Sequence, residues 1–217
     1  MHRGAEGRIL ILSFETSTRA FSVSLQHGEE RVDLEIIRSS FHSQSIVSVV
    51  DFLLKSIGAS VKDVDEIYCG TGPGSFTGIR IGLAFANTLC ETLGIPIAGI
   101  SSLDLLAFDS GKWYNAVISF IRSRKKEVYT AAYKGGRRTS DYMALERGEF
   151  EQFLRRDNSG CIAASEEDIR SLELESTLAG REVVFSFPRA KHAYPLASTL
   201  GVRPEKVFLK PLYVRNF

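Results

Sequence analysis

The sequence predicts an α/β protein of two lobes. Short apolar runs typical of strands alternate with amphipathic stretches typical of helices along the chain. This pattern breaks near residues 104–112, about halfway along the 217 residues, and each half has the size of an ordinary domain. We therefore place an N-terminal lobe at residues 1–108 and a second α/β lobe at residues 109–217.

Three strands are predicted at the start of the first lobe. Residues 9–14 are nearly all apolar, as expected for a central strand that is buried on both faces. Residues 21–25 and 32–36 alternate apolar with polar side chains, which is typical of half-buried strands. Short polar links join the three segments, so we expect an antiparallel meander.

Two helices and two more strands complete the first lobe. Apolar residues recur at helical spacing within 43–57, and a second helix is predicted from about 79 to 93. Apolar runs at 67–69 and 97–100 flank the second helix and predict strands. The predicted order of the first lobe is β-β-β-α-β-α-β.

The second lobe shows the same kinds of pattern. Two apolar runs predict strands at 116–121 and 128–133, and a two-glycine turn at 134–137 follows them. Apolar residues at 150–154 share one face of a short helix. Further strands are predicted at 140–145, around Ile162 and at 183–185.

Composition excludes several classes of protein. There are 27 Lys and Arg against 26 Asp and Glu, so a net charge of +1 excludes binding of nucleic acid by bulk positive charge. No apolar run approaches the roughly 18 residues of a membrane-spanning helix, and the polar start does not resemble a secretory signal. Three cysteines in apolar contexts, with no CxxC pair, indicate reduced thiols in a cytoplasmic protein.

The densest feature is a glycine loop between a predicted strand and the second helix. Gly70, Gly72, Gly74 and Gly78 would allow positive φ and close approach, and the amides at the helix start could hold a phosphate. The loop lacks the lysine of a Walker A motif, the spacing of a GxGxxG fingerprint and the glycines of a nucleophile elbow. Two interpretations remain open, a phosphate-binding loop and a tight turn that permits close helix packing.

The residues of this loop resemble those of a known family. Gly72-Pro73-Gly74-Ser75-Phe76-Thr77-Gly78-Ile79-Arg80-Ile81-Gly82-Leu83 closely resembles the glycine loop of the TsaB (YeaZ) family. Four other segments are similar to motifs of that family, namely the opening strand 11–18, the helix start 41–44, the segment 127–129 and the tail 211–215.

The resemblance implies a fold and a function. The fold would be two ribonuclease-H-like lobes of the actin-like ATPase (ASKHA) superfamily. The function would be that of a non-catalytic partner of TsaD, which transfers a threonylcarbamoyl group to an adenosine of tRNA, with the small ATPase TsaE as a further partner. We expect a homodimer in isolation, contact with tRNA through the complex, no membrane, no required cofactor, and ATP or ADP at the partner interface.

Departures from the family pattern favour the non-catalytic interpretation. The resemblance places an Asp in the turn after the first strand and another in the segment at 122–129, whereas this chain has Glu15 and Arg122 there. TsaD carries two metal-binding histidines where this chain has residues 100–106 without any histidine. We therefore expect no catalytic residue and no metal site. The candidate phosphate or nucleotide residues are Glu15, Gly72, Gly74, Ser75, Thr77 and Gly78.

The two first-lobe helices are the expected partner surface. Surplus apolar side chains would form it, and the candidates are Val47, Val50, Leu54, Ile81, Phe85 and Leu89. His42 is either a local helix-start residue or a contact with a partner or nucleotide. Arg80 is a cation in the first turn of a helix, where the dipole disfavours it, which favours pairing with an acid or a phosphate. The basic run 122–126 with Arg137 and Arg138 is either a solvated face or a contact with tRNA phosphate.

Three hypotheses of function follow. The first is a scaffold that activates TsaD. The second is an ATP-binding phosphotransferase or ATPase of the same superfamily, which would turn over ATP with Mg²⁺ in isolation. The third is a protease, for which the sequence offers no Ser-His-Asp, Cys-His or zinc motif.

Overall fold

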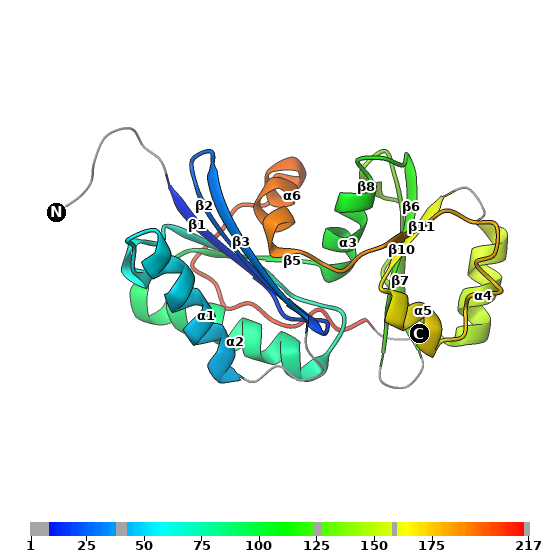
Figure 1. The fold of residues 1–217 in the computed structure, drawn as a ribbon, viewed down its shortest axis with the longest axis horizontal. Coiled ribbons are helices and arrows are strands. Elements are labelled where there is room, and N and C mark those ends of the chain that lie inside the picture. Colours follow the sequence, from blue (N-terminus) through cyan, green and yellow to red (C-terminus); the bar gives the residue numbers. More distant parts are fainter. Residues whose placement is uncertain (1–8, 38–42, 124–126, 158–159, 215–217) are drawn as a thin grey trace.

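The computed structural model describes residues 9–37, 43–123, 127–157 and 160–214. Two lobes lie side by side, each built on a mixed β-sheet with helices packed against it (Figure 1). The predicted fold class, α/β with two lobes, is confirmed. Within the described residues, no helix is both long and apolar enough to cross a membrane.

The first lobe contains a five-stranded sheet of order β3-β2-β1-β4-β5. Strands β1, β2 and β3 are antiparallel neighbours, whereas β1, β4 and β5 run parallel. All six residues of β1 are buried, which explains why four of them are apolar, while Ser13 and Glu15 are buried polar residues. The strands are β1 (Leu10–Glu15), β2 (Ala20–His27), β3 (Glu30–Ile37), β4 (Glu66–Gly70) and β5 (Ile97–Ile100).

Helices α1 (Ser43–Ser56) and α2 (Phe76–Leu93) cover one face of this sheet (Figure 1). A short 3-10 turn, η1 (Val61–Asp63), lies between α1 and β4. The buried core between helices and sheet includes Leu12, Phe14 and Phe21 from the strands and Leu53 and Leu83 from the helices.

The second lobe repeats the strand connections of the first. Its sheet has the order β11-β10-β6-β7-β8, with β9 also paired to β7. Strands β6 and β7 are antiparallel, and β10 and β11 run parallel to β6, as β4 and β5 do to β1. The strands are β6 (Ala116–Arg122), β7 (Val128–Lys134), β8 (Arg137–Arg138), β9 (Met143–Leu145), β10 (Cys161–Ala164) and β11 (Val183–Phe185). Helices α4 (Arg147–Arg156) and α5 (Glu166–Ser171) belong to this lobe.

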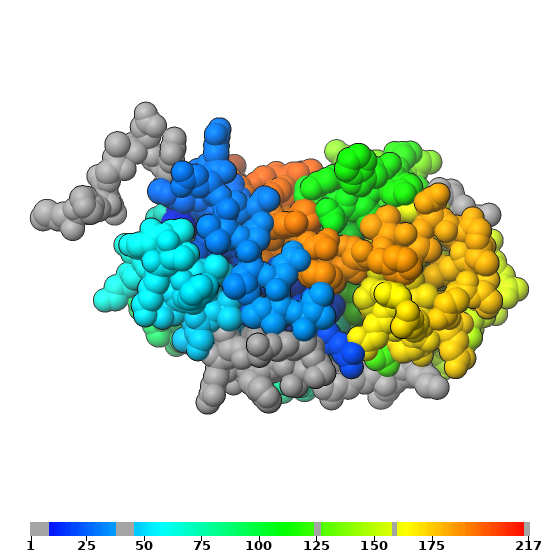
Figure 2. Space-filling view, viewed as in Figure 1, coloured from blue at the N-terminus to red at the C-terminus, as the bar shows by residue number. Residues whose placement is uncertain are grey.

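Each lobe is completed by a helix from the other half of the chain. Helix α3 (Ser102–Ser110) follows β5, yet Leu103, Leu106 and Ala107 pack on the sheet of the second lobe. The turn η2 (Ala190–His192) and helix α6 (Ala193–Leu200) follow β11, yet α6 packs on β1 and β4 of the first lobe. Figure 2 shows the segment that leads into α6, in orange, filling the space between the lobes.

Most predicted elements are confirmed to within a few residues. The predicted second helix begins three positions earlier, at Phe76, because Ser75 caps it. The predicted strand at 140–145 is shorter, since only Met143–Leu145 pairs with β7. Helices α3, α5 and α6 were not predicted. The boundary between residues 108 and 109 stays a prediction, and α3 spans it.

Candidate functional site

The glycine loop connects the end of β4, Gly70, to the start of α2, Phe76. Gly72 and Gly74 have φ values of 94° and 152°, a region that favours glycine, and the peptide between Gly72 and Pro73 is cis. The Ser75 hydroxyl accepts a hydrogen bond from the Gly78 amide at 3.3 Å and so caps α2.

The loop packs directly against the β1–β2 turn. The Ser75 amide donates to the Ser17 carbonyl oxygen at 2.6 Å. The Thr16 hydroxyl donates to the Gly78 carbonyl oxygen at 2.8 Å. A Cβ at Gly74 would lie 2.2 Å from the Ser17 oxygen, and one at Gly78 would lie 2.0 Å from the Thr16 oxygen. Glycine is therefore required here by contact within the protein, and the Ser75 amide is already hydrogen-bonded to backbone.

Glu15 lies beneath the loop and is fully buried. One carboxylate oxygen accepts from the Ser17 amide at 2.5 Å, and the other accepts from the Ser102 hydroxyl, at the start of α3, at 2.9 Å. Gly70 faces the carboxylate so closely that a Cβ there would lie 1.9 Å from it. Burial raises the pKa of Glu15, and its hydrogen bonds from Ser17 and Ser102 oppose that shift only in part.

The C-terminal tail returns to the first lobe and crosses the glycine loop. The Asn87 side chain exchanges two hydrogen bonds with the backbone of Leu209, at 3.0 and 2.8 Å. The Leu212 amide then donates to the Thr71 carbonyl oxygen at 2.9 Å. This pairing holds the tail beside residues 71–74 of the loop.

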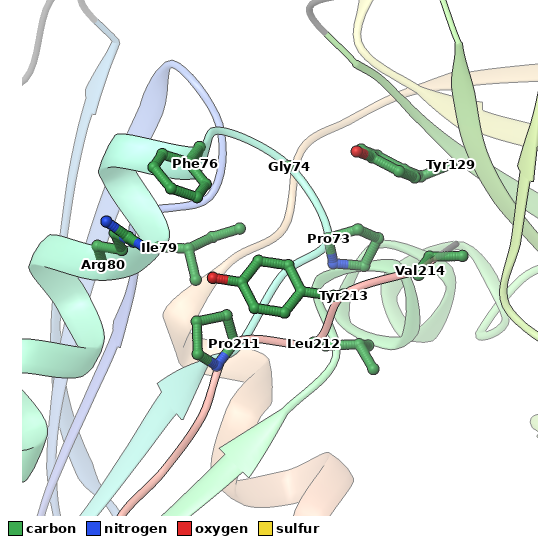
Figure 3. A pocket seen from close by; sticks show the side chains of 10 residues that line it. All are labelled: Pro73, Gly74, Phe76, Ile79, Arg80, Tyr129, Pro211, Leu212, Tyr213 and Val214. Carbon is green, nitrogen blue, oxygen red and sulfur yellow. The ribbon is translucent and has the colours of Figure 1, made fainter. Parts of the chain in front are cut away.

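A hollow, here called the tail hollow, lies between the tail, the loop and the second lobe (Figure 3). Tyr213 points from the tail toward Ile79 and Arg80, and Tyr129 of β7 lies across from it (Figure 3). The Arg80 guanidinium stacks 4.0 Å from the ring centroid of Phe76. The predicted pairing of Arg80 with an acid is not seen among the described residues, where its contact is with this ring.

An ion pair links the two lobes next to the site. Arg19, in the β1–β2 turn, pairs with Glu167 of α5 at 2.5 Å. Arg122, at the end of β6, lies 3.8 Å from Asp168, whose carboxylate also accepts from the Arg122 amide at 3.3 Å. Burial raises the pKa of Asp168 above its ordinary value, and the contacts with Arg122 oppose that shift only in part.

The structure brings most of the predicted phosphate-site residues together. Gly74 and Gly78 contact the β1–β2 turn, and Glu15 lies where that turn begins. Thr77, in contrast, is exposed in the first turn of α2. Sequence reasoning missed Ser102 as a partner of Glu15. The signal that could have found the tail as part of the site is the run 211–214, which resembles a motif of the family.

The predicted partner surface is only partly exposed. Val47 is 56% exposed, and Ile81 and Phe85 are partly buried. In contrast, Val50, Leu54 and Leu89 are buried in the first-lobe core, so their assignment to an interface was wrong. They belong to the helix faces that pack on the sheet, because the same apolar stripe that predicts a helix also marks its buried side.

The cysteines and histidines form no metal site in the described part of the chain. No group of three or more His, Cys, Asp or Glu side chains suited to a metal ion occurs there. Cys69 and Cys161 are buried and Cys90 is partly buried, and burial raises the pKa of the Cys69 and Cys161 thiols. The interpretations of His42 and of the basic residues 124–126 concern positions outside the described residues.

Comparison with known proteins gives the family. The model of the family described as "TsaD: tRNA N6-adenosine threonylcarbamoyltransferase" matches residues 37–200. Proteins named "tRNA threonylcarbamoyladenosine biosynthesis protein TsaB" from Haemophilus influenzae and Escherichia coli are 27% and 29% identical to this chain. These alignments cover 96% and 95% of this chain and 94% of each relative. The chain belongs to the TsaB (YeaZ) family.

Solved structures agree with this assignment. YeaZ from Pseudomonas aeruginosa superposes with a TM-score of 0.78 at 25% identity, over 95% of this chain and all of that one. A third relative by sequence, the protein named TsaB from Bacillus subtilis, is 36% identical over 57% of this chain and 55% of its own length. The expected architecture of two α/β lobes is thereby confirmed for this TsaB-family chain.

Proposed function

We propose that this chain is a non-catalytic subunit of a complex that makes N6-threonylcarbamoyladenosine in tRNA. The observation that carries the proposal is similarity over nearly the whole length to proteins named for that biosynthesis. In this proposal the chain binds a TsaD-type transferase and activates it by contact. A TsaE-type ATPase joins the complex, tRNA is bound through the complex, and the site of action is the cytoplasm.

The non-catalytic role is supported by the contacts of the glycine loop. Both oxygens of Glu15 accept hydrogen bonds from the chain itself, and burial raises its pKa, which disfavours the anionic form that binds a cation. The Ser75 amide is directed at the Ser17 oxygen rather than outward. The Arg19–Glu167 ion pair lies between the lobes. A nucleotide, ATP or ADP, is therefore proposed at the interface with the partner rather than within this chain.

The α1–α2 layer is proposed as the contact surface for the partner. It carries Val47 and Phe52, which are 56% and 63% exposed, and the partly buried Ile81 and Phe85. Contiguous apolar patches on a surface mark protein interfaces, and in this proposal these side chains form part of one. The same surface is proposed to pair two copies of the chain in isolation, so homodimer and heterodimer should compete.

The test is reconstitution of tRNA threonylcarbamoylation with purified TsaD-type and TsaE-type proteins. We expect omission of this chain to abolish or sharply reduce activity. Val47→Glu and Phe52→Glu should each weaken binding of the transferase, because each places a charge in an apolar contact. Phe185→Glu is the matched control, since Phe185 is 62% exposed on β11 of the other lobe.

Two outcomes would contradict the proposal. Full activity without this chain would exclude the activating role. Mg²⁺-dependent ATP hydrolysis by the isolated chain, reduced by Glu15→Ala, would instead support the phosphotransferase or ATPase hypothesis. If Phe52→Glu and Phe185→Glu behave alike, the proposed contact surface is wrong even where the activating role holds.

A further inference from the structure

A second cavity lies between the two exchanged helices, and it is lined along α3 from Asp104 onward. Its volume is about 330 Å³, and its walls come from α3, α6 and the β7–β8 hairpin. It shares no lining residue with the tail hollow. Since α3 packs on the second sheet and α6 on the first, a molecule bound there would contact elements that belong to both lobes.

The wall of this α3–α6 cavity is largely apolar. Ala107 and Phe108 of α3 face Leu196 and Leu200 of α6. The volume lies at the lower end of the range for small-molecule sites, which are typically apolar with a few polar groups that fix orientation. The cavity therefore has room for an apolar body about the size of a fused pair of aromatic rings.

Polar groups at one end of the cavity are held in place by one carboxylate. The Tyr133 and Tyr142 hydroxyls donate to the two oxygens of Asp104, at 2.7 and 2.6 Å. Both tyrosines are thus fixed by hydrogen bonds as well as by packing. Because its oxygens are occupied in this way, Asp104 is poorly placed to bind a cationic ligand.

Two cations line the cavity and favour an anion. The Arg138 guanidinium lies 4.0 Å from the ring centroid of Tyr142 and donates to the Ser140 carbonyl oxygen at 2.6 Å. Among the described residues, no carboxylate lies within ion-pair distance of it. Lys112 lies 5.6 Å from the ring centroid of Phe108, and its Nζ is 3.9 Å from Asp109, a long and weak ion pair.

The aromatic rings themselves also argue against a cationic ligand. Aromatic faces attract cations, but Tyr142 already has Arg138 over its ring and Phe108 has Lys112 near its ring. With one carboxylate occupied by tyrosines and two cations on the lining, the complementary ligand carries negative charge.

We propose that the α3–α6 cavity is a binding site for a small amphipathic anion, with an aromatic or similar apolar body and one anionic group such as a carboxylate. The body lies between Phe108, Leu196 and Leu200, and the anionic group pairs with Arg138 and Lys112. This site does not depend on the proposed role in tRNA modification.

The probe is 2-naphthoate, titrated into the full chain and followed by calorimetry and by amide chemical shifts. We expect binding in the micromolar to millimolar range, with shifts at α3, α6 and the β7–β8 hairpin. Arg138→Gln should weaken binding roughly tenfold or more, as expected for loss of a charge-assisted hydrogen bond. Arg137→Gln, a neighbour on the same exposed strand that does not line the cavity, should leave affinity unchanged.

Three further measurements decide the proposal. Thr199→Trp, an exposed position on the lining, should block binding while the protein stays folded. The isosteric cation 2-naphthylmethylammonium should bind much more weakly than 2-naphthoate. The proposal is overturned if 2-naphthoate does not bind at millimolar concentration, if the cation binds equally well, or if Arg138→Gln and Arg137→Gln have the same effect.

Discussion

Gly78→Ala tests whether the glycines of the loop serve contact within the protein. The added methyl group would lie 2.0 Å from the Thr16 carbonyl oxygen, where ordinary contacts begin at 3.4 Å. Helix α2 and the β1–β2 turn must therefore separate by more than an ångström. Two hydrogen bonds span this contact, from the Thr16 hydroxyl to the Gly78 oxygen and from the Ser75 amide to the Ser17 oxygen.

The expected loss of stability follows from these contacts. Breaking two hydrogen bonds costs about 1–3 kcal/mol, and more where a buried group is left without a partner. Alanine in a helix recovers about 1 kcal/mol relative to glycine. The difference between these two terms predicts that Gly78→Ala lowers the free energy of unfolding by about 0–2 kcal/mol, and by more if a buried group is left without a partner.

Urea unfolding followed by circular dichroism measures this change, with Gly148→Ala as the matched control. Gly148 is also helical, but a Cβ there would meet no atom within 4 Å. That variant should be more stable than the unmodified chain by about 0.5–1 kcal/mol. If both variants gain stability, the close approach of the loop to the β1–β2 turn is wrong.

Three other predictions concern Glu15, the tail and the second core. Because burial raises the pKa of Glu15 above its ordinary 4.5, its stabilising contribution is full below that pH and is lost as pH rises through the folded-state pKa. Glu15→Gln should therefore lose less unfolding free energy than the unmodified chain between about pH 5 and about pH 8 in urea titrations. Asn87→Ala removes both hydrogen bonds to Leu209, so trypsin should cut the tail roughly ten- to a hundredfold faster, as mass spectrometry would show. Phe150→Ala should cost about 3–5 kcal/mol in urea unfolding, since Phe150 is fully buried at 4.9 Å from the Phe120 ring, and an equal effect of Phe185→Ala would contradict this.

The strands of both lobes could be predicted because their burial follows a simple rule. Strand β1 is buried on both faces and is apolar except for Ser13 and Glu15, whereas β3 alternates and its apolar side is only partly buried. Strand β2 departs from the prediction of a half-buried strand, because its alternating Ser22 and Ser24 are buried as well. Helix α3 breaks the corresponding rule for helices. Leu105 packs with the first lobe, while Leu103 and Leu106 pack with the second, so α3 is buried on several sides and shows no single apolar stripe.

The site could be predicted in part. The glycine loop was visible because four glycines between a strand and a helix are unusual in sequence. The contacts of those glycines could not be predicted, because Thr16 and Ser17 lie far from them in the sequence and meet them only in the folded protein. The partner of Glu15, Ser102, lies 87 positions away in the chain. No local pattern reports a hydrogen bond of that separation.

The exchanged helices have a consequence for synthesis on the ribosome. The face of the first sheet that carries Ile11, Tyr68 and Ile100 is covered by α6, which is translated only after all the strands of both sheets. Until then that apolar face is open to water or to a chaperone. The second sheet has no such delay, since α3 is translated before it. The lobe that is made first is therefore the one completed last.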